Sequence, residues 1–315
     1  MKNTFSLKVK DELSRLEPGN SCCLRSELLG FLRAGAVLEV GQSGIQVIAT
    51  TESPSVVRRA FMLLKRTSSL KVKISCEPRR IHNHNLYAVR LFMQPGLKEF
   101  LKRLGYLRSD TDLEKTVIPR KGCCRRAYLR GFFLGAGSMT NPERYYHLEL
   151  VTGSRKHAAH LIRILRVFDL HARRVERKER QVVYLKEGDE IAAFLTVIGA
   201  VKSRLDFENV RVVKGVRNHV NRVVNCETAN LNKTVKAACR QLGAIRFLVG
   251  RVGLDALPQP LQEVARLRLE QPEATLKELG LQLDPPLGKS GVNHRLRRLE
   301  EIAAGLKAQQ KKVFR

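Results

Sequence analysis

At 315 residues the chain is long enough for two domains, because single hydrophobic cores usually stop growing below about 300 residues. Its 58 lysines and arginines against 30 acidic residues give a formal net charge of +28, which favours a polyanionic partner over a merely soluble basic protein. No apolar run approaches the roughly 18 residues of a spanning helix, and the N-terminal segment has no apolar signal region, so we expect a cytoplasmic protein without a membrane partner.

An internal repeat organises the first two hundred residues. The segment Cys22–Phe31 recurs 101 residues later as Cys123–Phe132, with the Cys-Cys pair, a leucine and a Gly-Phe pair at matching positions. A repeat of this length is too long for a solenoid and indicates two related half-domains, at residues 1–115 and 116–218.

Each half is predicted to contain a helix rich in small residues, a strand, a serine-capped helix, two more strands and a closing amphipathic helix. In the first half, the first helix, first strand and closing helix are predicted at 26–34, 44–51 and 96–104. In the second half, the same three elements are predicted at 127–135, 145–152 and 190–198. Glycines in the first helices cost about 1 kcal/mol each in helix propensity, and close helix–helix approach is the usual reason for them. We therefore expect these two helices to cross tightly at a pseudo-twofold seam.

Connector helices are predicted at residues 219–250, before a C-terminal domain at 251–315. In this connector, short amides recur at helical spacing on one polar stripe. They would bond phosphates or, equally, belong to a helix that caps the first domain. The candidate connector residues are Asn221, Arg222, Asn225, Asn230 and Lys233.

A helix-turn-helix is predicted at about residues 275–307. Thr275 and Glu278 form a capping box for a short helix, which Gly280 is expected to end. The next helix has a buried stripe that includes Val292 and Leu296, with polar and cationic residues opposite. The candidate DNA-binding residues are Lys289, Ser290, Asn293, His294, Arg295, Arg297 and Arg298.

Roles within this set follow from side-chain chemistry. Asparagine pairs with adenine and arginine with guanine in bidentate fashion, so Asn293 and Arg297 are the candidate base readers. Lys289, Arg295 and Arg298 are expected to meet phosphates. The alternative is a solvated basic helix.

The two halves resemble the LAGLIDADG homing-endonuclease fold, whose motif aligns with Leu28-Leu29-Gly30 and Leu129-Arg130-Gly131. The paired Cys-Cys helices together with the segment Asn221–Thr234 resemble the WhiA family over nearly the whole chain. This resemblance implies an α+β fold: a pseudo-twofold duplicated LAGLIDADG-like αββαββα domain followed by an all-α helix-turn-helix domain.

The resemblance also implies a bacterial DNA-binding regulator linked to sporulation, cell division and chromosome segregation. The expected partner is double-stranded DNA in the nucleoid, with another transcription regulator or RNA polymerase as a further candidate, and no small-molecule substrate or cofactor. An RNA- or protein-binding adaptor in division or segregation is the alternative function.

An active endonuclease is the weaker hypothesis. The motif's eighth position carries the metal-binding acid in each half, and here these positions are Gly35 and Ala136. Glu39 lies one turn further on, but its counterpart in the repeat is Thr140. Two-metal hydrolysis needs oxygen ligands for both ions, so we expect no catalytic residues and no enzyme activity.

A secondary basic surface is predicted on the two halves. Lys71 and Lys73 alternate with apolar residues, as on a strand with one solvated face. An ordinary charged sheet edge explains the pattern equally well. The candidate residues are Arg58, Arg59, Lys71, Lys73, Arg125, Arg126, Arg173 and Arg174.

The seven cysteines do not indicate a disulfide framework. Cys22-Cys23 and Cys123-Cys124 suggest a four-thiolate zinc site, but their spacing differs from the usual C-x₂₋₄-C. Neighbouring side chains on a helix also point about 100° apart, so two adjacent thiols are not expected to reach one ion. We therefore predict no metal and interpret these residues as small side chains packed at the seam.

Overall fold

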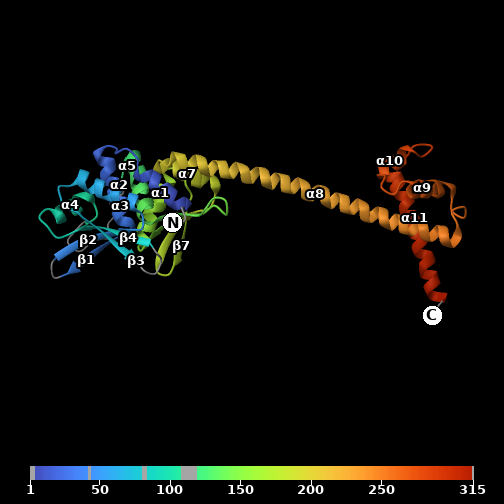
Figure 1. Ribbon diagram of the computed structural model, residues 1–315, viewed down its shortest axis with the longest axis horizontal. Coiled ribbons are helices and arrows are strands. Elements are labelled where there is room, and N and C mark those ends of the chain that lie inside the picture. Colours follow the sequence, from blue (N-terminus) through green and yellow to red (C-terminus); the bar gives the residue numbers. More distant parts are fainter. Residues whose placement is uncertain (1–3, 42–43, 80–83, 108–118, 314–315) are drawn as a thin grey trace. The chain divides into compact units, whose positions relative to one another are not determined.

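The computed structural model describes residues 4–41, 44–79, 84–107 and 119–313 (Figure 1). The chain divides into two compact units, residues 1–215 and 216–315, which are described in turn. The boundary predicted between the two halves, at 115/116, lies outside the described residues. Within the described ranges, no helix combines the length and the apolarity that crossing a membrane requires.

The first unit consists of two αββαββα halves, as the fold prediction has it. Its helices are α1 (Phe5–Ser14), α2 (Ser21–Gly35), α3 (Pro54–Thr67), α4 (Leu97–Leu104), α5 (Gly122–Ala136), α6 (Arg155–Arg166), α7 (Gly188–Ile198) and the beginning of α8 (Val201–Val252). Its strands are β1 (Ala36–Gly41), β2 (Gly44–Thr51), β3 (Lys73–Arg79), β4 (His84–Leu91), β5 (Gly137–Met139), β6 (Leu148–Thr152), β7 (Arg173–Arg177) and β8 (Arg180–Leu185). The two antiparallel sheets have the matching orders β1-β2-β4-β3 and β5-β6-β8-β7.

The seam between the halves is made by α2 and α5. A Cβ on Gly30 would overlap the carbonyl oxygen of Tyr128, and one on Gly131 would overlap the carbonyl oxygen of Glu27. Two helix backbones approach this closely only where a side chain is missing from each, so the predicted reason for these glycines is confirmed. Phe132 and Phe133 are fully buried beside the seam.

Three elements of this unit differ from the elements predicted from the sequence. Strands β1 and β5 follow the seam helices directly, where the sequence analysis expected a single strand further on. β1 exposes Val37 and Val40, and β5 is only three residues long, so neither segment shows in its sequence the alternation of apolar and polar residues by which a half-buried strand is predicted. Helix α1 was not predicted; Ser and Lys interrupt its short apolar pattern, although Val9 and Leu13 are buried.

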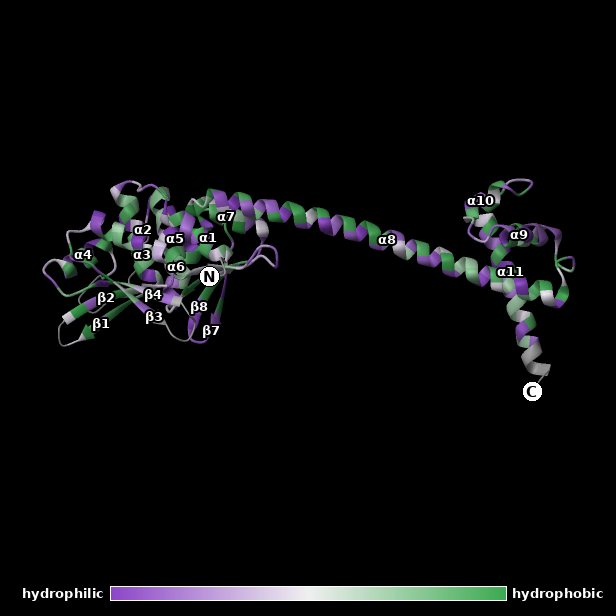
Figure 2. Ribbon diagram, viewed as in Figure 1, coloured by the Kyte–Doolittle hydropathy of each residue, from purple (hydrophilic) through white to green (hydrophobic). Residues whose placement is uncertain are grey.

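The second unit is all-helical and contains the end of α8, α9 (Gln259–Glu270), α10 (Leu276–Leu281) and α11 (Lys289–Val313). Its core includes Ile245 and Leu248 of α8, Val264 of α9, and Leu279 of α10. The predicted connector at 219–250 is thus one part of a continuous helix, whose last turns belong to the C-terminal core. Hydrophobic residues lie among hydrophilic ones along α8 (Figure 2). The exposed Val212, Val216, Val220 and Val223 recur four, four and three residues apart and so form an exposed apolar stripe.

Helix α10 begins as the sequence predicts and ends differently. The Oγ1 of Thr275 accepts a bond from the amide of Glu278, whose carboxylate accepts one from the amide of Thr275 in return, so the capping box is confirmed. Gly280 does not end the helix, which continues to Leu281. The carbonyl oxygen of Gly280 accepts a 2.8 Å hydrogen bond from the amide of Leu287, and a Cβ at Gly280 would overlap the carbonyl oxygen of Leu287. The glycine therefore permits close passage of the following loop.

Candidate nucleic-acid interface

The strongest candidate interface is the N-terminal half of α11. Val292, Leu296 and Leu299 are completely buried, and they pack in one core with Leu279 of α10 and Val264 of α9. Their spacing of four and three residues follows the helical repeat, so this stripe fixes the rotation of α11 about its axis. The opposite side of the helix must then face solvent.

That solvent-facing side carries the predicted recognition residues. Ser290, His294 and Arg297 are exposed and recur at i, i+4 and i+7, while Asn293 beside them is half-buried. Lys289, the first residue of α11, is also exposed. Most of the side chains predicted to contact DNA thus lie on one accessible face at the start of a helix.

Two arginines of the same helix already have protein partners. Arg295 is only partly exposed; its Nη1 lies 3.3 Å from the carbonyl oxygen of Pro260 and 4.0 Å from a carboxylate oxygen of Glu263. It therefore contacts α9, where the sequence analysis expected a phosphate contact. Arg298 pairs with Glu301 at 2.9 Å, but both side chains are largely exposed and this pair is weak.

Arg268, which was not predicted from the sequence, fixes the loop that precedes α10. Arg268 of α9 is buried, and its Nη1 donates to the carbonyl oxygens of Ala274, at 2.7 Å, and Pro272, at 3.3 Å. Burial lowers the pKa of this guanidinium. The bonds tie the end of α9 to the loop that leads into the capping box. In the sequence, Arg268 is one more cation in a helix, and nothing marks it as buried.

The predicted secondary basic surface is only partly assembled on the sheets. The register pairs Lys73 with Arg90, and Arg173 with Tyr184, on the sheet faces opposite those where Leu91 and Val183 are buried. Lys71 lies before β3, and Arg174 falls on the same face as Val183. Acidic residues share the outer faces and neutralise part of their charge: Glu77 lies 2.9 Å from Arg90, and Glu149 lies 3.1 Å from Arg177.

Three other members of that set serve different purposes. Arg59 is buried, with its Nε 2.8 Å from Oε1 of Glu27 at the seam, whereas its neighbour Arg58 is exposed. Arg125 donates from its Nε to the carbonyl of Pro119 at 2.9 Å. Arg126 lies with its guanidinium 5.6 Å from the centre of the Phe168 ring. Arg125 and Arg126 belong to the first turns of α5 and not to a sheet.

The predicted connector residues are all on the surface of α8. Asn221, Arg222, Asn225, Asn230 and Lys233 are exposed. Two of them make local contacts, with Arg222 Nε 3.3 Å from the Asn218 carbonyl oxygen and Asn230 Nδ2 3.7 Å from the Cys226 sulfur. Their exposure leaves these short amides and cations available for phosphate contacts, which stay a prediction.

The motif positions that would carry catalytic acids lie at the ends of the seam helices. Gly35 is the last residue of α2 and Ala136 is the last residue of α5. Glu39 is exposed on β1 and accepts a 2.6 Å bond from Gln46. Among the residues that the structure describes, only one group of three or more His, Cys, Asp or Glu side chains is placed to hold a metal ion, and it contains no carboxylate.

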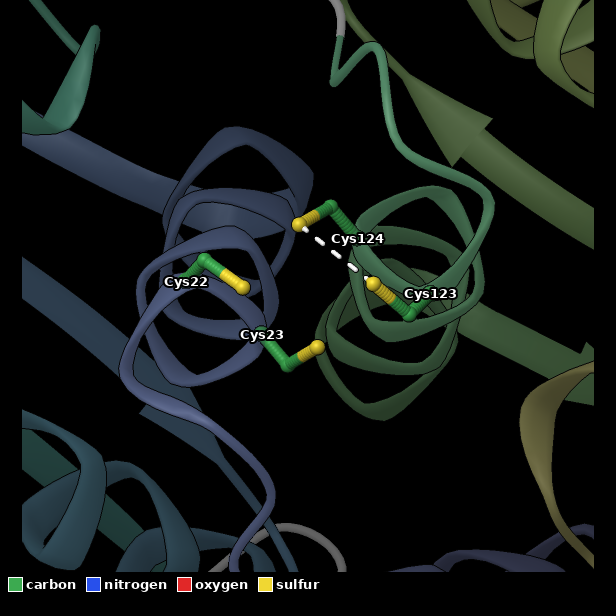
Figure 3. Close-up of side chains that lie close together, drawn as sticks. All are labelled: Cys22, Cys23, Cys123 and Cys124. Atoms are coloured by element: carbon green, nitrogen blue, oxygen red, sulfur yellow. Dashed lines mark hydrogen bonds between the residues drawn. The ribbon is translucent and has the colours of Figure 1, made fainter.

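That group is the four seam cysteines, Cys22, Cys23, Cys123 and Cys124. Their sulfur atoms all lie within 4.8 Å of one another, so the expectation that adjacent thiols would not converge is wrong (Figure 3). The reason is the crossing of two helices: a thiol that diverges from its neighbour on one helix turns toward the other helix.

Comparison with known proteins follows the same division of the chain. Three family models match it: the WhiA N-terminal LAGLIDADG-like domain over residues 21–107, the WhiA LAGLIDADG-like domain over 125–217 and the WhiA C-terminal HTH domain over 220–303. Two similar relatives, each 46% identical, are named "Probable cell division protein WhiA". The one from Heliobacterium modesticaldum aligns over 97% of this chain and 98% of its own length. The one from Desulforamulus reducens aligns over 97% of both.

Solved structures agree with this assignment. The crystal structure of full-length WhiA from Thermatoga maritima is 29% identical over 96% of this chain and 98% of its own, with a TM-score of 0.61. A crystal structure of the N-terminal LAGLIDADG domain of WhiA is 26% identical over 63% of this chain and 92% of its own, with a TM-score of 0.53.

Proposed function

Because the chain belongs to the WhiA family, we propose that it is a non-enzymatic, DNA-binding transcription regulator that acts in cell division, chromosome segregation or sporulation. The observation that carries this proposal is the exposed face of α11, on which Ser290, His294 and Arg297 lie opposite a fully buried apolar stripe. Helix-turn-helix proteins insert the start of such a helix into the major groove. The name of the relatives, cell division protein, supports the cellular process.

Within this interface, the residues divide between positioning and reading. Lys289 and Arg298 carry exposed charges and would meet phosphates, which fix the register of the protein on the duplex. Asn293 and Arg297 would read adenine and guanine edges. Arg295 is assigned instead to positioning α11 against α9, because its guanidinium lies near Pro260 and Glu263.

The first unit is proposed to hold DNA, or a protein partner such as RNA polymerase, without cutting DNA. Gly35 and Ala136 offer no oxygen side chain at the motif's acid positions. The exposed cations Lys73 and Arg173 are available on the outer faces of the two sheets. The net charge of +28 would keep the protein on the nucleoid by electrostatic attraction alone.

The test compares specific and random duplexes. A target is first selected from random DNA with the full-length protein, and binding of wild type and Arg297→Ala is then measured at one fixed salt concentration. Loss of a base-reading arginine should weaken target binding by about 1–3 kcal/mol and change random-duplex binding much less. Arg266→Ala is the matched control, because this exposed arginine lies on α9 outside the recognition face. Equal loss on both duplexes would contradict base reading.

The adaptor alternative is separated by crosslinking in cells. Sequencing of crosslinked DNA, with an RNase-treated sample beside it, should give discrete sites that survive RNase and disappear in the Arg297→Ala strain. Sites that vanish on RNase treatment would favour an RNA-binding adaptor, and an absence of discrete DNA sites would favour a protein-binding one.

A further inference from the structure

The four seam cysteines come from two different halves of the first unit. Cys22 and Cys23 lie in the first turn of α2, and Cys123 and Cys124 lie in the first turn of α5. Cys124 is buried, Cys22 and Cys23 are half-buried, and Cys123 is exposed, so solvent reaches the cluster from the side of Cys123. A small ion therefore has a route to all four sulfurs.

The distances suit a single tetrahedral ion. With a metal–sulfur bond of about 2.3 Å, as in four-thiolate zinc sites, tetrahedral sulfurs lie about 3.8 Å apart. The Cys123 and Cys124 sulfurs are 4.0 Å apart, and no pair in the cluster exceeds 4.8 Å. Small rotations of the side chains close the remaining difference.

Two other uses of four thiols fit this geometry less well. An iron–sulfur cluster places several iron and sulfide atoms between its cysteines, which holds the thiolates farther apart than a single ion does. Two disulfides would require two close sulfur pairs and place no condition on the other distances. Here all four sulfurs lie close to one another. Of the three arrangements, only a single ion bound by all four sulfurs requires this.

The surroundings favour thiolates bound to a cation. Both pairs lie at helix N-termini, where the backbone amides and the helix dipole stabilise negative charge. Lys121 adds positive charge beside Cys22, and Arg130 adds it beside Cys23. Four thiolates on one divalent ion carry a net charge of −2, which these groups offset.

The surroundings shift the pKa values of the cluster's thiols in different directions. A hydrogen bond from Cys124 and the charge of Lys121 lower the pKa of Cys22. Burial and the neighbouring thiols raise the pKa of Cys23 to about 12 and also raise the pKa of Cys124. Negative charge on one thiol opposes ionisation of its neighbours, and a bound cation would offset that repulsion.

We propose that Cys22, Cys23, Cys123 and Cys124 bind one Zn²⁺ ion, which fastens the two halves together at the start of their seam. Each thiol releases its proton to solvent on binding, so zinc binding strengthens as pH rises. The ion joins residues about 100 positions apart in the chain, and closing so long a loop restricts the unfolded state strongly. The proposal departs from the sequence-based expectation of no metal.

The experiment measures metal in the full-length protein. Protein purified under reducing conditions in the presence of zinc, then desalted, should contain one zinc per chain by mass spectrometry of the metal. Titration with Co²⁺ should give the absorption of a tetrahedral four-thiolate complex, displaced by zinc. Cys22→Ser and Cys123→Ser should each lose this metal, while Cys76→Ser, an exposed cysteine of β3 outside the cluster, should keep it.

The wild-type readouts remain decisive even where a variant folds poorly. Zinc should raise the Tm of the wild type and of Cys76→Ser, and should leave the Tm of the Cys22→Ser, Cys123→Ser double variant unchanged. The proposal is overturned if wild-type protein gives no four-thiolate Co²⁺ spectrum. It is also overturned if the reduced protein holds no more zinc than the double variant, or if protein isolated with zinc under argon has a mass four hydrogens too low, as two disulfides would produce.

Discussion

Gly131 on α5 faces the carbonyl oxygen of Glu27 on α2 so closely that a Cβ at Gly131 would fall well inside 3.0 Å of that oxygen. The Gly131→Ala variant must push the two seam helices apart or bend one of them. Overpacking of this kind costs about 1–3 kcal/mol, and we expect the free energy of unfolding to fall by the upper end of that range. Urea unfolding followed by circular dichroism measures it.

The matched control for this variant is Gly122→Ala. Gly122 begins the same helix, and nothing lies within 4 Å of the position of its Cβ. Alanine there should leave stability unchanged or raise it by up to about 1 kcal/mol, since only helix propensity changes. Similar effects of the two alanines would show that the seam does not require glycine at Gly131.

Two adjacent arginines on α3 should differ strongly in how much stability the same substitution costs. Arg59 is buried with its guanidinium at 2.8 Å from Glu27, and Arg58 is exposed. Removing one partner of a buried pair leaves an uncompensated charge, so Arg59→Met should lower the free energy of unfolding by about 3 kcal/mol. Part of the loss is relieved by Arg130, which lies 3.3 Å from Glu27.

Arg58→Met is the control and should change stability by less than about 0.5 kcal/mol. Both variants are compared by thermal and urea unfolding of the full chain. A large loss at Arg58, or none at Arg59, would contradict the assignment of Arg59 to the seam and return it to the basic surface.

Much of the architecture follows from local patterns in the sequence. β2 occupies the predicted residues 44–51, and the capping box at Thr275 forms as predicted. The repeat predicts two related halves, and its glycines predict the close seam. These features depend on residues near one another in the chain, or on a constraint such as a missing side chain that any tight crossing imposes.

Features that depend on how two elements meet could not be predicted in this way. Arg58 and Arg59 look alike in the sequence, and only the position of Glu27 on another helix separates a buried cation from an exposed one. Arg268 and Arg295 are likewise distinguished by carbonyl oxygens of other segments. The cysteine cluster forms because α2 and α5 cross, and the spacing of the cysteines within either pair does not predict that crossing.

Lys10 should make stability depend on pH. Its ammonium lies 5.9 Å from the centre of the Phe133 ring, and burial lowers its pKa from 10.5 to about 8, an effect that Glu52 partly offsets. Between these two pH values the unfolded chain still binds the proton and the folded chain does not, so this lysine makes stability rise with pH across the window.

Lys10→Met should therefore be more stable than wild type at neutral pH, and the difference should shrink as pH rises from about 8 to 10.5. One pKa unit corresponds to about 1.4 kcal/mol, but solvent reaches part of this side chain, so we expect a gain of about 1–2 kcal/mol at pH 7. Unfolding of both proteins in parallel at several pH values isolates the lysine from the other titrating groups. If the stability difference between the two proteins grew with pH, the fold would be stabilising the charged form of Lys10, contrary to this prediction.

Lys289 should contribute to affinity without contributing to sequence preference. It is exposed at the first residue of α11, where its ammonium can meet a phosphate while the bases lie within reach of Asn293 and Arg297. Removing one phosphate contact releases about one counterion fewer, so Lys289→Ala should reduce the slope of log K against log salt by about 0.9. Its affinity should fall by the same factor on target and random duplexes.

In Arg297→Ala, by contrast, target affinity should fall more than random affinity because a base contact is lost. A Lys289→Ala variant that keeps the wild-type slope but loses target preference would place a base reader at Lys289, and would mean that α11 lies in the groove with its first turn deeper than its middle.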